Sequence, residues 1–84
     1  MVKAYFDPQG EFVEVTIEKG RGLFAYDVEE FAFSFLMREH GVIGDLSARI
    51  NFWMLTNAGK VVQFAYAGKI ETQDTFILRY TLEL

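Results

Sequence analysis

Residues 27–41 have the sequence DVEEFAFSFLMREHG, and they form the one segment of the chain with a clear helical pattern. Apolar residues recur here at the i, i+3, i+4, i+7 and i+8 spacing that places them on one face of a helix. They are Val28, Phe31, Ala32, Phe35 and Leu36, and Phe33 and Met37 widen the face. Because the polar stripe is narrow, we expect the helix to be covered over most of its circumference.

Both ends of this segment carry signals for helix termini. Asp27 is a favoured N-cap residue, and Glu30 follows it at the spacing of a capping box. Gly41 suits the left-handed position just past a helix. His40 places a potentially positive group in the last turn, where the helix dipole favours positive charge. We therefore predict a helix over Asp27–Gly41.

Five segments rich in β-branched and aromatic residues flank the predicted helix. They are Val2–Phe6, Phe12–Glu18, Ser47–Thr56, Lys60–Gly68 and Phe76–Leu84. We predict a single domain, residues 1–84, with the order β-β-α-β-β-β. The fold class is α+β, a two-layer sandwich with one helix packed on a mainly antiparallel five-stranded sheet. A β-grasp-like arrangement, in which the first and last strands are parallel, is the alternative.

Side-chain parity predicts the pairing within both hairpins. Asp7-Pro8-Gln9-Gly10 has Asp, Pro and Gly where a type I turn prefers them. A four-residue loop then brings all six apolar residues of the first hairpin to one face, with Phe6 opposite Val13, Ala4 opposite Val15 and Val2 opposite Ile17. A three-residue loop with Gly59 in the left-handed position gives the second hairpin an apolar face, with Met54 opposite Val62, Phe52 opposite Phe64 and Ile50 opposite Tyr66.

Composition narrows the classes of function. The net charge is −4 and the basic residues are scattered, whereas binding to nucleic acid or to an anionic membrane needs concentrated positive charge. The chain has no cysteine, which excludes disulfides and thiolate metal sites. No signal peptide or membrane-spanning segment is evident. We expect a soluble, cytoplasmic, acidic protein that binds neither nucleic acid nor membrane.

The sequence contains no recognisable catalytic constellation. His40 is the only histidine, and no second residue stands at a spacing that would complete a triad or a metal site with it. We predict no catalytic residue, no metal and no cofactor, so an enzymatic role is disfavoured. Gly20, Arg21 and Gly22 could form a small anion-binding loop before the helix. A turn that needs positive φ explains these glycines more simply, because the full phosphate-binding patterns are missing.

The protein is rich in aromatic residues, with nine Phe, four Tyr and one Trp. Five strands form a sheet roughly 24 Å wide, whereas one helix is only about 10–12 Å across. A single helix therefore covers about half of the apolar face, so we expect the core to be completed by association. The favoured form is a homodimer, with a protein partner as the other possibility. The alternative to association is a strongly twisted sheet that wraps the helix as a self-sufficient monomer.

These patterns support two hypotheses about function. The first is a small non-enzymatic interaction or accessory protein that acts through self-association or docking on a partner protein. Its surface would comprise Arg49, Trp53, Leu55, Ile77 and Arg79, because Trp and Arg dominate binding hot spots. The second is a small-molecule-binding protein or small enzyme, with an aromatic pocket between helix and sheet lined by Phe33, Tyr66 and Tyr80.

Overall fold

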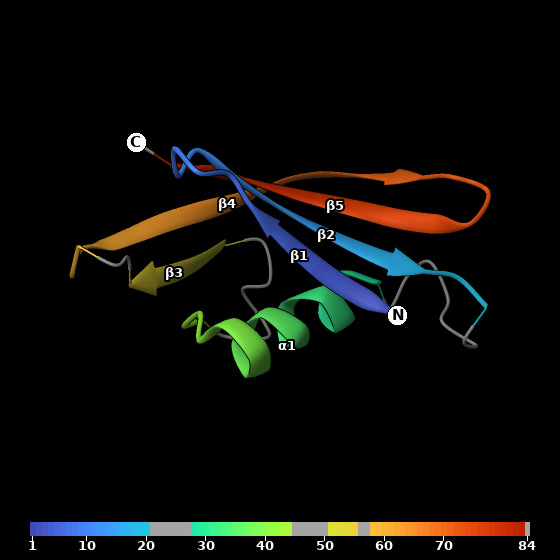
Figure 1. Cartoon of the computed structure of the whole chain (residues 1–84), viewed down its shortest axis with the longest axis horizontal. Coiled ribbons are helices and arrows are strands. Elements are labelled where there is room, and N and C mark those ends of the chain that lie inside the picture. The colour runs from blue at the N-terminus through green and yellow to red at the C-terminus, as the bar shows by residue number, and fades with distance from the viewer. Residues whose placement is uncertain (21–27, 45–50, 56–57, 84) are drawn as a thin grey trace.

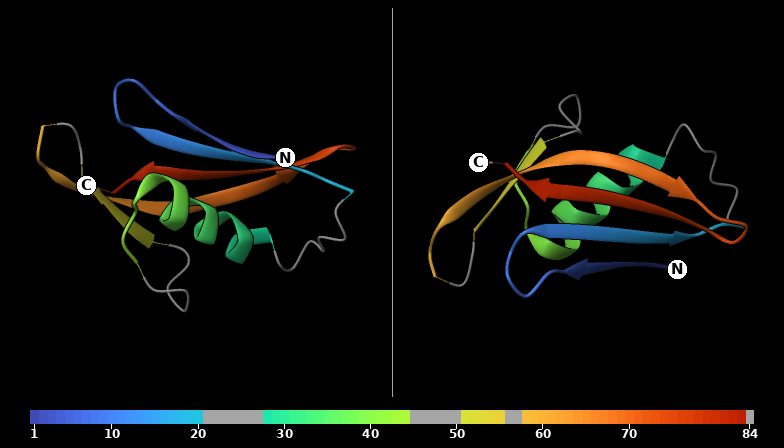
Figure 2. Two further views of the ribbon diagram at one scale, coloured as in Figure 1. Left: turned by 60° about the horizontal axis from the view of Figure 1, so that its bottom comes forward. Right: turned by 90° about the horizontal axis from the view of Figure 1, so that it is seen from above.

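In the part of the chain that the structure describes, one helix packs against one face of a curled five-stranded sheet (Figures 1 and 2). The computed structural model describes residues 1–20, 28–44, 51–55 and 58–83. In chain order the elements are β1 (Val2–Phe6), β2 (Phe12–Glu18), α1 (Val28–His40), β3 (Asn51–Leu55), β4 (Val61–Glu71) and β5 (Thr75–Leu82). The predicted order β-β-α-β-β-β and the α+β class are confirmed.

All strand pairs are antiparallel, and the strand order across the sheet is β1-β2-β5-β4-β3. The last strand therefore lies between β2 and β4, and β1 lies at the margin of the sheet. A β-grasp arrangement would require β1 and β5 to be parallel neighbours, so that alternative is wrong. The pairing of β2 with β5 extends from Phe12 opposite Thr81 to Glu18 opposite Thr75. Because β4 pairs with the other side of β5, β1 cannot pair with β5.

The predicted registers of both hairpins are confirmed where the structure describes them. Val2, Ala4 and Phe6 lie opposite Ile17, Val15 and Val13. In the second hairpin Phe52 lies opposite Phe64 and Met54 opposite Val62, whereas Ile50 lies outside the described residues. The Asp7 carboxylate accepts a hydrogen bond from the Glu11 N–H at 3.1 Å, and Gly59 has the expected positive φ of 79°.

The helix differs from its prediction in the face that it buries. Its described start is Val28, since Asp27 lies outside the described residues, and Gly41 follows its end with φ of 67°. Phe33 is fully buried, whereas Phe31 remains 41% exposed. The buried face is rotated toward β3 because the curled sheet reaches around that flank of the helix, where the Phe33 ring lies 6.5 Å from that of Phe52.

Three strands also differ from their predicted bounds. β5 begins at Thr75 instead of Phe76 and ends at Leu82. β4 extends to Glu71 instead of ending at Gly68, and Ala67 is an extra residue at a β-bulge between Tyr66 and Gly68. β3 is described only over Asn51–Leu55, because the remainder of the predicted strand is not described. The bulge reverses the direction of the side chains that follow it. The alternation of apolar and polar residues in the sequence does not predict this reversal.

The sheet has an inner face toward α1 and an outer face away from it. The curl of the sheet lets one helix bury the centre of the inner face, including Phe52, Phe64, Leu78 and Tyr80. Apolar side chains toward the margins of this face are only partly buried, and they are Val2, Ala4, Phe6, Met54, Val62, Tyr66 and Leu82. The expectation that half of the face stays uncovered was therefore too strong. No helix in the described part of the chain is long and apolar enough to span a membrane.

Candidate functional site

The residues predicted to line a pocket lie in one aromatic cluster on the inner face. The rings of Tyr66 and Tyr80 are 5.7 Å apart between centroids. Phe52 stacks against Phe64 at 5.3 Å and meets Tyr80 edge-on at 5.1 Å. Phe33 joins the cluster through Phe52. The structure thus brings the three predicted residues together, but Phe33 and Tyr80 are buried as packed core residues.

An ion pair borders this cluster where the first turn of α1 meets β4. The bulge aligns Lys69 with Leu78, which is buried on the inner face, so the Lys69 side chain lies toward the helix. Its Nζ lies 3.1 Å from Oε2 of Glu29. The Tyr66 hydroxyl donates a hydrogen bond to the same oxygen at 3.0 Å. The site therefore holds a carboxylate between an ammonium group and a phenol.

The protonation of these groups follows from their surroundings. Burial and the hydrogen bond to the Glu29 carboxylate raise the pKa of Tyr66 to about 12. Burial also raises the pKa of Glu29, but the hydrogen bonds from Lys69 and Tyr66 and a backbone hydrogen bond together outweigh it, so the pKa falls below the ordinary value. At neutral pH the Glu29 carboxylate is ionised and the Tyr66 phenol is protonated. This pair is therefore suited to hydrogen bonding rather than to proton transfer.

The hydroxyl of Tyr80 has no hydrogen-bond partner among the described residues, although the side chain is 1% exposed. Burial, together with the nearby Tyr66 and Glu29, raises the pKa of Tyr80. The hydroxyl therefore stays protonated and can donate one hydrogen bond. A buried donor of this kind needs an explanation, such as a bound water or a ligand oxygen.

The predicted interaction surface divides into two parts of the outer face. Trp53 and Leu55 are exposed on β3, whereas Arg49 lies outside the described residues. Arg79 lies on β5, where its guanidinium group is 4.0 Å from the centroid of the Phe12 ring and 3.7 Å from the Glu14 carboxylate. Ile77 is partly buried. The Arg79 guanidinium group therefore packs on the Phe12 ring of β2, and β4 separates its strand from β3.

Two further residues join Trp53 and Leu55 in what we call the outer strip. Ile43 forms an isolated antiparallel bridge with Trp53, with N–H···O distances of 2.8 and 2.9 Å. Val61 lies directly opposite Leu55. Three members of the strip are more than 60% exposed, and Trp53 is 39% exposed. The alternating pattern of β4 could have indicated Val61, but no local signal in the sequence places Ile43 beside β3.

The predicted anion-binding loop is described only at Gly20, which has a positive φ of 93°. Arg21 and Gly22 lie outside the described residues, so the loop stays a prediction. His40 lies near two rings, with centroid distances of 4.8 Å to Phe6 and 5.4 Å to Phe35. In the described ranges, no three His, Asp or Glu side chains are grouped so that they could hold a metal ion.

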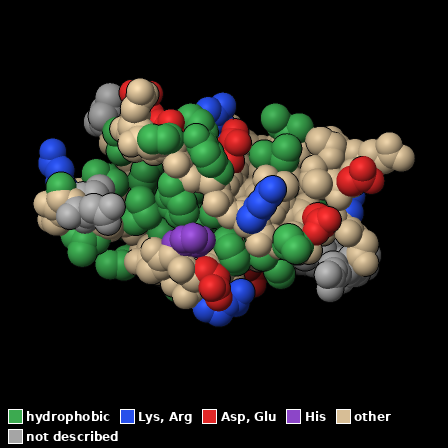
Figure 3. Space-filling model, viewed as in Figure 1, with side chains coloured by type: hydrophobic (Ala, Val, Ile, Leu, Met, Phe, Trp, Pro, Cys, Tyr) green, Lys and Arg blue, Asp and Glu red, His purple; other side chains and the backbone are tan. Residues whose placement is uncertain are grey.

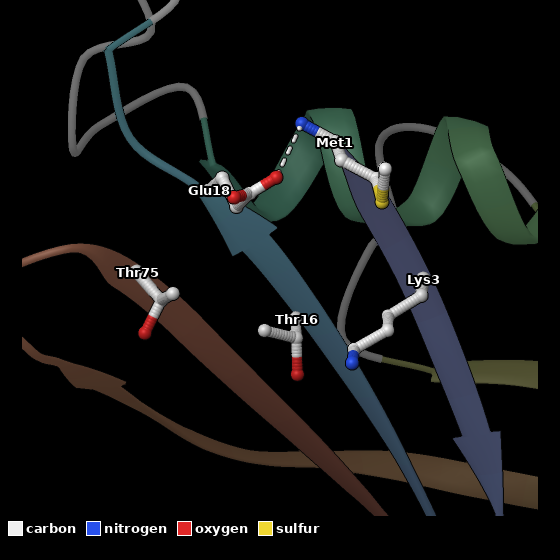
Figure 4. A pocket seen from close by; sticks show the side chains of 5 residues that line it. All are labelled: Met1, Lys3, Thr16, Glu18 and Thr75. Carbon is white, nitrogen blue, oxygen red and sulfur yellow. Dashed lines mark ion pairs between the residues drawn. The ribbon is translucent and has the colours of Figure 1, made fainter.

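A shallow hollow on the outer face lies across the ends of β1, β2 and β5 (Figure 4). It is lined by Met1, Lys3, Thr16, Glu18 and Thr75. The α-amino group lies 3.2 Å from the Glu18 carboxylate, and both groups are exposed. The hollow is open and mainly surrounded by solvated side chains, so it does not resemble an enclosed ligand site.

Comparison with known proteins found no matching protein family, no matching curated protein and no matching solved structure.

Proposed function

We propose that this chain is a small non-enzymatic interaction protein of the cytoplasm that acts through self-association or docking on a partner protein, with a homodimer as the favoured form. The observation that carries the proposal is the outer strip, Ile43, Trp53, Leu55 and Val61. These side chains lie on adjacent backbone segments and remain exposed after the core is complete. Exposed apolar groups that adjoin one another mark interaction sites more often than isolated ones do.

The strip is not required for the packing of the domain itself. The core consists of inner-face residues and the buried face of α1, whereas the strip lies on the opposite face of β3 and β4. Each fully buried aliphatic side chain contributes about 1.5–3 kcal/mol relative to an exposed one. Covering the strip with a partner protein would therefore supply a substantial driving force for docking, with Trp53 as an aromatic anchor.

The first test is the mass of the native chain in solution, measured by light scattering after size exclusion at high micromolar concentration. Self-association predicts a mass above the 9.7 kDa of one chain. A single species at the mass of the monomer contradicts self-association.

The second test asks what the strip does. The double variant Trp53→Ser/Leu55→Ser removes its centre, and Ile70→Ser is the matched control because Ile70 is as exposed as Leu55, at 63%, at the other end of the outer face. If the strip is a binding surface, the double variant loses either self-assembly or partner binding, whereas the control variant keeps both. If neither assembly nor partner binding changes, the strip has no role in binding.

A second candidate function is the binding of a small aromatic molecule that carries a hydrogen-bond acceptor. The observation that favours it is the buried hydroxyl of Tyr80, which has no hydrogen-bond partner among the described residues. A panel of small aromatic carboxylic acids can be screened by thermal shift, because a ligand that binds only the folded state raises its stability. Tyr80→Phe should abolish any such shift. A shift that persists in this variant places the ligand elsewhere.

A further inference from the structure

The two margins of the sheet differ in the described part of the chain. At one margin, Ile43 pairs with Trp53 and partly covers β3. At the other margin, β1 pairs with β2 on one side, and no described strand pairs with its other side. The right panel of Figure 2 shows β1 along the border of the sheet. An uncovered edge strand is a template for pairing with another chain.

The backbone groups that point away from β2 can be identified from the hydrogen bonds of the hairpin. The Asp7 N–H donates to the carbonyl of Phe12, and the Glu18 N–H donates to that of Met1. Hydrogen-bonded positions alternate along an antiparallel pair, so the odd-numbered residues of β1 bond to β2. The N–H and C=O groups of Val2, Ala4 and Phe6 consequently point toward the open edge.

The side chains of these same three residues lie on the inner face and are only partly buried. Figure 3 shows hydrophobic side chains gathered beside the single histidine, His40, whose ring contacts that of Phe6. Among the residues that the structure describes, the open edge therefore combines backbone groups that lack a strand partner with apolar surface. The strand contains no proline and no bulge, and its one charged residue is Lys3. Most of the devices that protect edge strands are thus missing from it.

We propose that β1 pairs in antiparallel orientation with β1 of a second copy of this chain, about a two-fold axis at Ala4, and so joins two sheets into one. This inference rests on the proposed function, because it names the interface of the homodimer. Ala4 then faces Ala4 of the second copy, and Val2 faces Phe6. Each of the three edge-facing N–H groups in each copy gains a carbonyl acceptor.

Charge favours this register over its neighbours. Lys3 lies opposite Tyr5 of the second copy, where an ammonium group can rest on an aromatic ring. A shift by two residues in one direction places Lys3 opposite Lys3, which is unfavourable. The same shift in the other direction moves part of the strand past the Asp7-Pro8 turn and loses pairs.

The size of the contact sets the expected affinity. A five-residue strand is about 17 Å long, and its pairing buries less than the roughly 800 Å² per partner of a standard interface. We therefore expect a reversible dimer that forms at micromolar concentration. The outer strip is not part of this contact, so the dimer presents two copies of it to any protein partner, which strengthens binding by avidity.

Disulfide formation between engineered cysteines tests the register, because the native chain has no cysteine. Lys3 and Tyr5 are exposed on the outer face, so replacing either one preserves the core. Lys3→Cys and Tyr5→Cys chains are mixed in equal amounts, oxidised and analysed by mass spectrometry. The proposed pair is directly opposite and non-hydrogen-bonded, with Cα atoms about 4.5 Å apart, within the range for a disulfide.

The expected result is a mixed disulfide that exceeds the statistical share several-fold, while each variant alone cross-links poorly because its cysteines are diagonal in the ladder. Ala4→Pro is the second variant. It removes an N–H that faces the open edge and leaves the bonds to β2 in place, so it should abolish the dimer and keep a cooperative thermal transition.

The outcomes separate this inference from the proposed function. A dimer by light scattering that gives only statistical cross-linking, or that persists in Ala4→Pro, overturns the β1 interface and leaves self-association standing. A monomer at high micromolar concentration overturns both. Loss of the dimer in Trp53→Ser/Leu55→Ser, with the fold retained, also overturns the β1 interface, since it assigns the contact to the outer strip.

Discussion

Replacing Tyr80 with Phe should stabilise the protein, although the position is in the centre of the core. The side chain is 1% exposed and its hydroxyl has no partner among the described residues. The ring contacts with Phe52 and Tyr66 are kept in the variant. A buried hydroxyl without a hydrogen bond costs about 1–3 kcal/mol. We expect a gain of about 1 kcal/mol, which corresponds to a rise in Tm of about 4–8 °C for a domain of this size.

Tyr66→Phe is the matched control because it removes the same atom from the neighbouring ring. That hydroxyl donates to the Glu29 carboxylate at 3.0 Å. Hydrogen bonds to charged groups contribute about 1.5–3 kcal/mol when buried, and Tyr66 is only partly buried. We expect a loss of about 1 kcal/mol, so the two Tyr→Phe changes should have opposite signs.

Chemical denaturation with urea measures both free energies of unfolding, and the slope with denaturant shows whether the transition stays two-state. If Tyr80→Phe lowers the free energy of unfolding as much as Tyr66→Phe does, the reasoning is refuted. The hydroxyl would then have a partner in solution, such as an ordered water.

Three other changes test the contacts around the helix. The pKa of the Glu29 carboxyl is lower in the folded state than its ordinary value of 4.5. The ionised carboxylate therefore stabilises the fold above that pH, and this stabilisation is lost as the pH falls through the folded pKa. Lys69→Met should lower the free energy of unfolding by about 1 kcal/mol at pH 7 and by almost nothing in strong acid, as measured by urea denaturation at both pH values. Gly68→Ala should cost about 1–3 kcal/mol because Gly68 has φ of 126° at the bulge; an unchanged Tm would contradict a fixed bulge. Gly44→Ala should cost about 1–3 kcal/mol by overpacking, since its Cβ would lie 2.5 Å from Cζ of Phe33; a neutral thermal melt would show that the ring can move aside.

Local patterns in the sequence predicted the hairpins well. A four-residue loop brings six apolar residues of the first hairpin to one face, and the structure has the register that this loop predicts. The turn residues agree with it, since Asp7 accepts the hydrogen bond that such a turn needs. In the second hairpin, Gly59 and the facing pair Phe52 and Phe64 carried equivalent information. Where loop length and side-chain parity agree, short-range information is sufficient.

Features that depend on the whole sheet could not be predicted in this way. The side of α1 that is buried depends on how the sheet curls. The helical periodicity alone therefore did not predict that Phe33 would be more buried than Phe31. The bulge before Gly68 directs Lys69 toward the helix, against the simple alternation of β4. Ile43 stands in a turn-rich link and has no strand pattern, but it pairs with Trp53. Each of these is a tertiary contact without a local signature.

The candidate site was predicted only in part, because some of its contacts join residues from distant elements. Tyr66 and Tyr80 alternate in phase with the apolar face of their strands and are neighbours in the sheet. Their acidic partner comes from the helix, so the carboxylate of Glu29 could be assigned only from the structure. Trp53 and Leu55 were predicted to be exposed together, whereas the stacking of Arg79 on Phe12 required the order of the strands.

Self-association is the central claim, and sedimentation equilibrium of the unmodified chain over a range of micromolar concentrations tests it most directly. We predict that the average mass rises with concentration from 9.7 kDa toward twice that value. A mass that stays at 9.7 kDa across the whole range would contradict the claim.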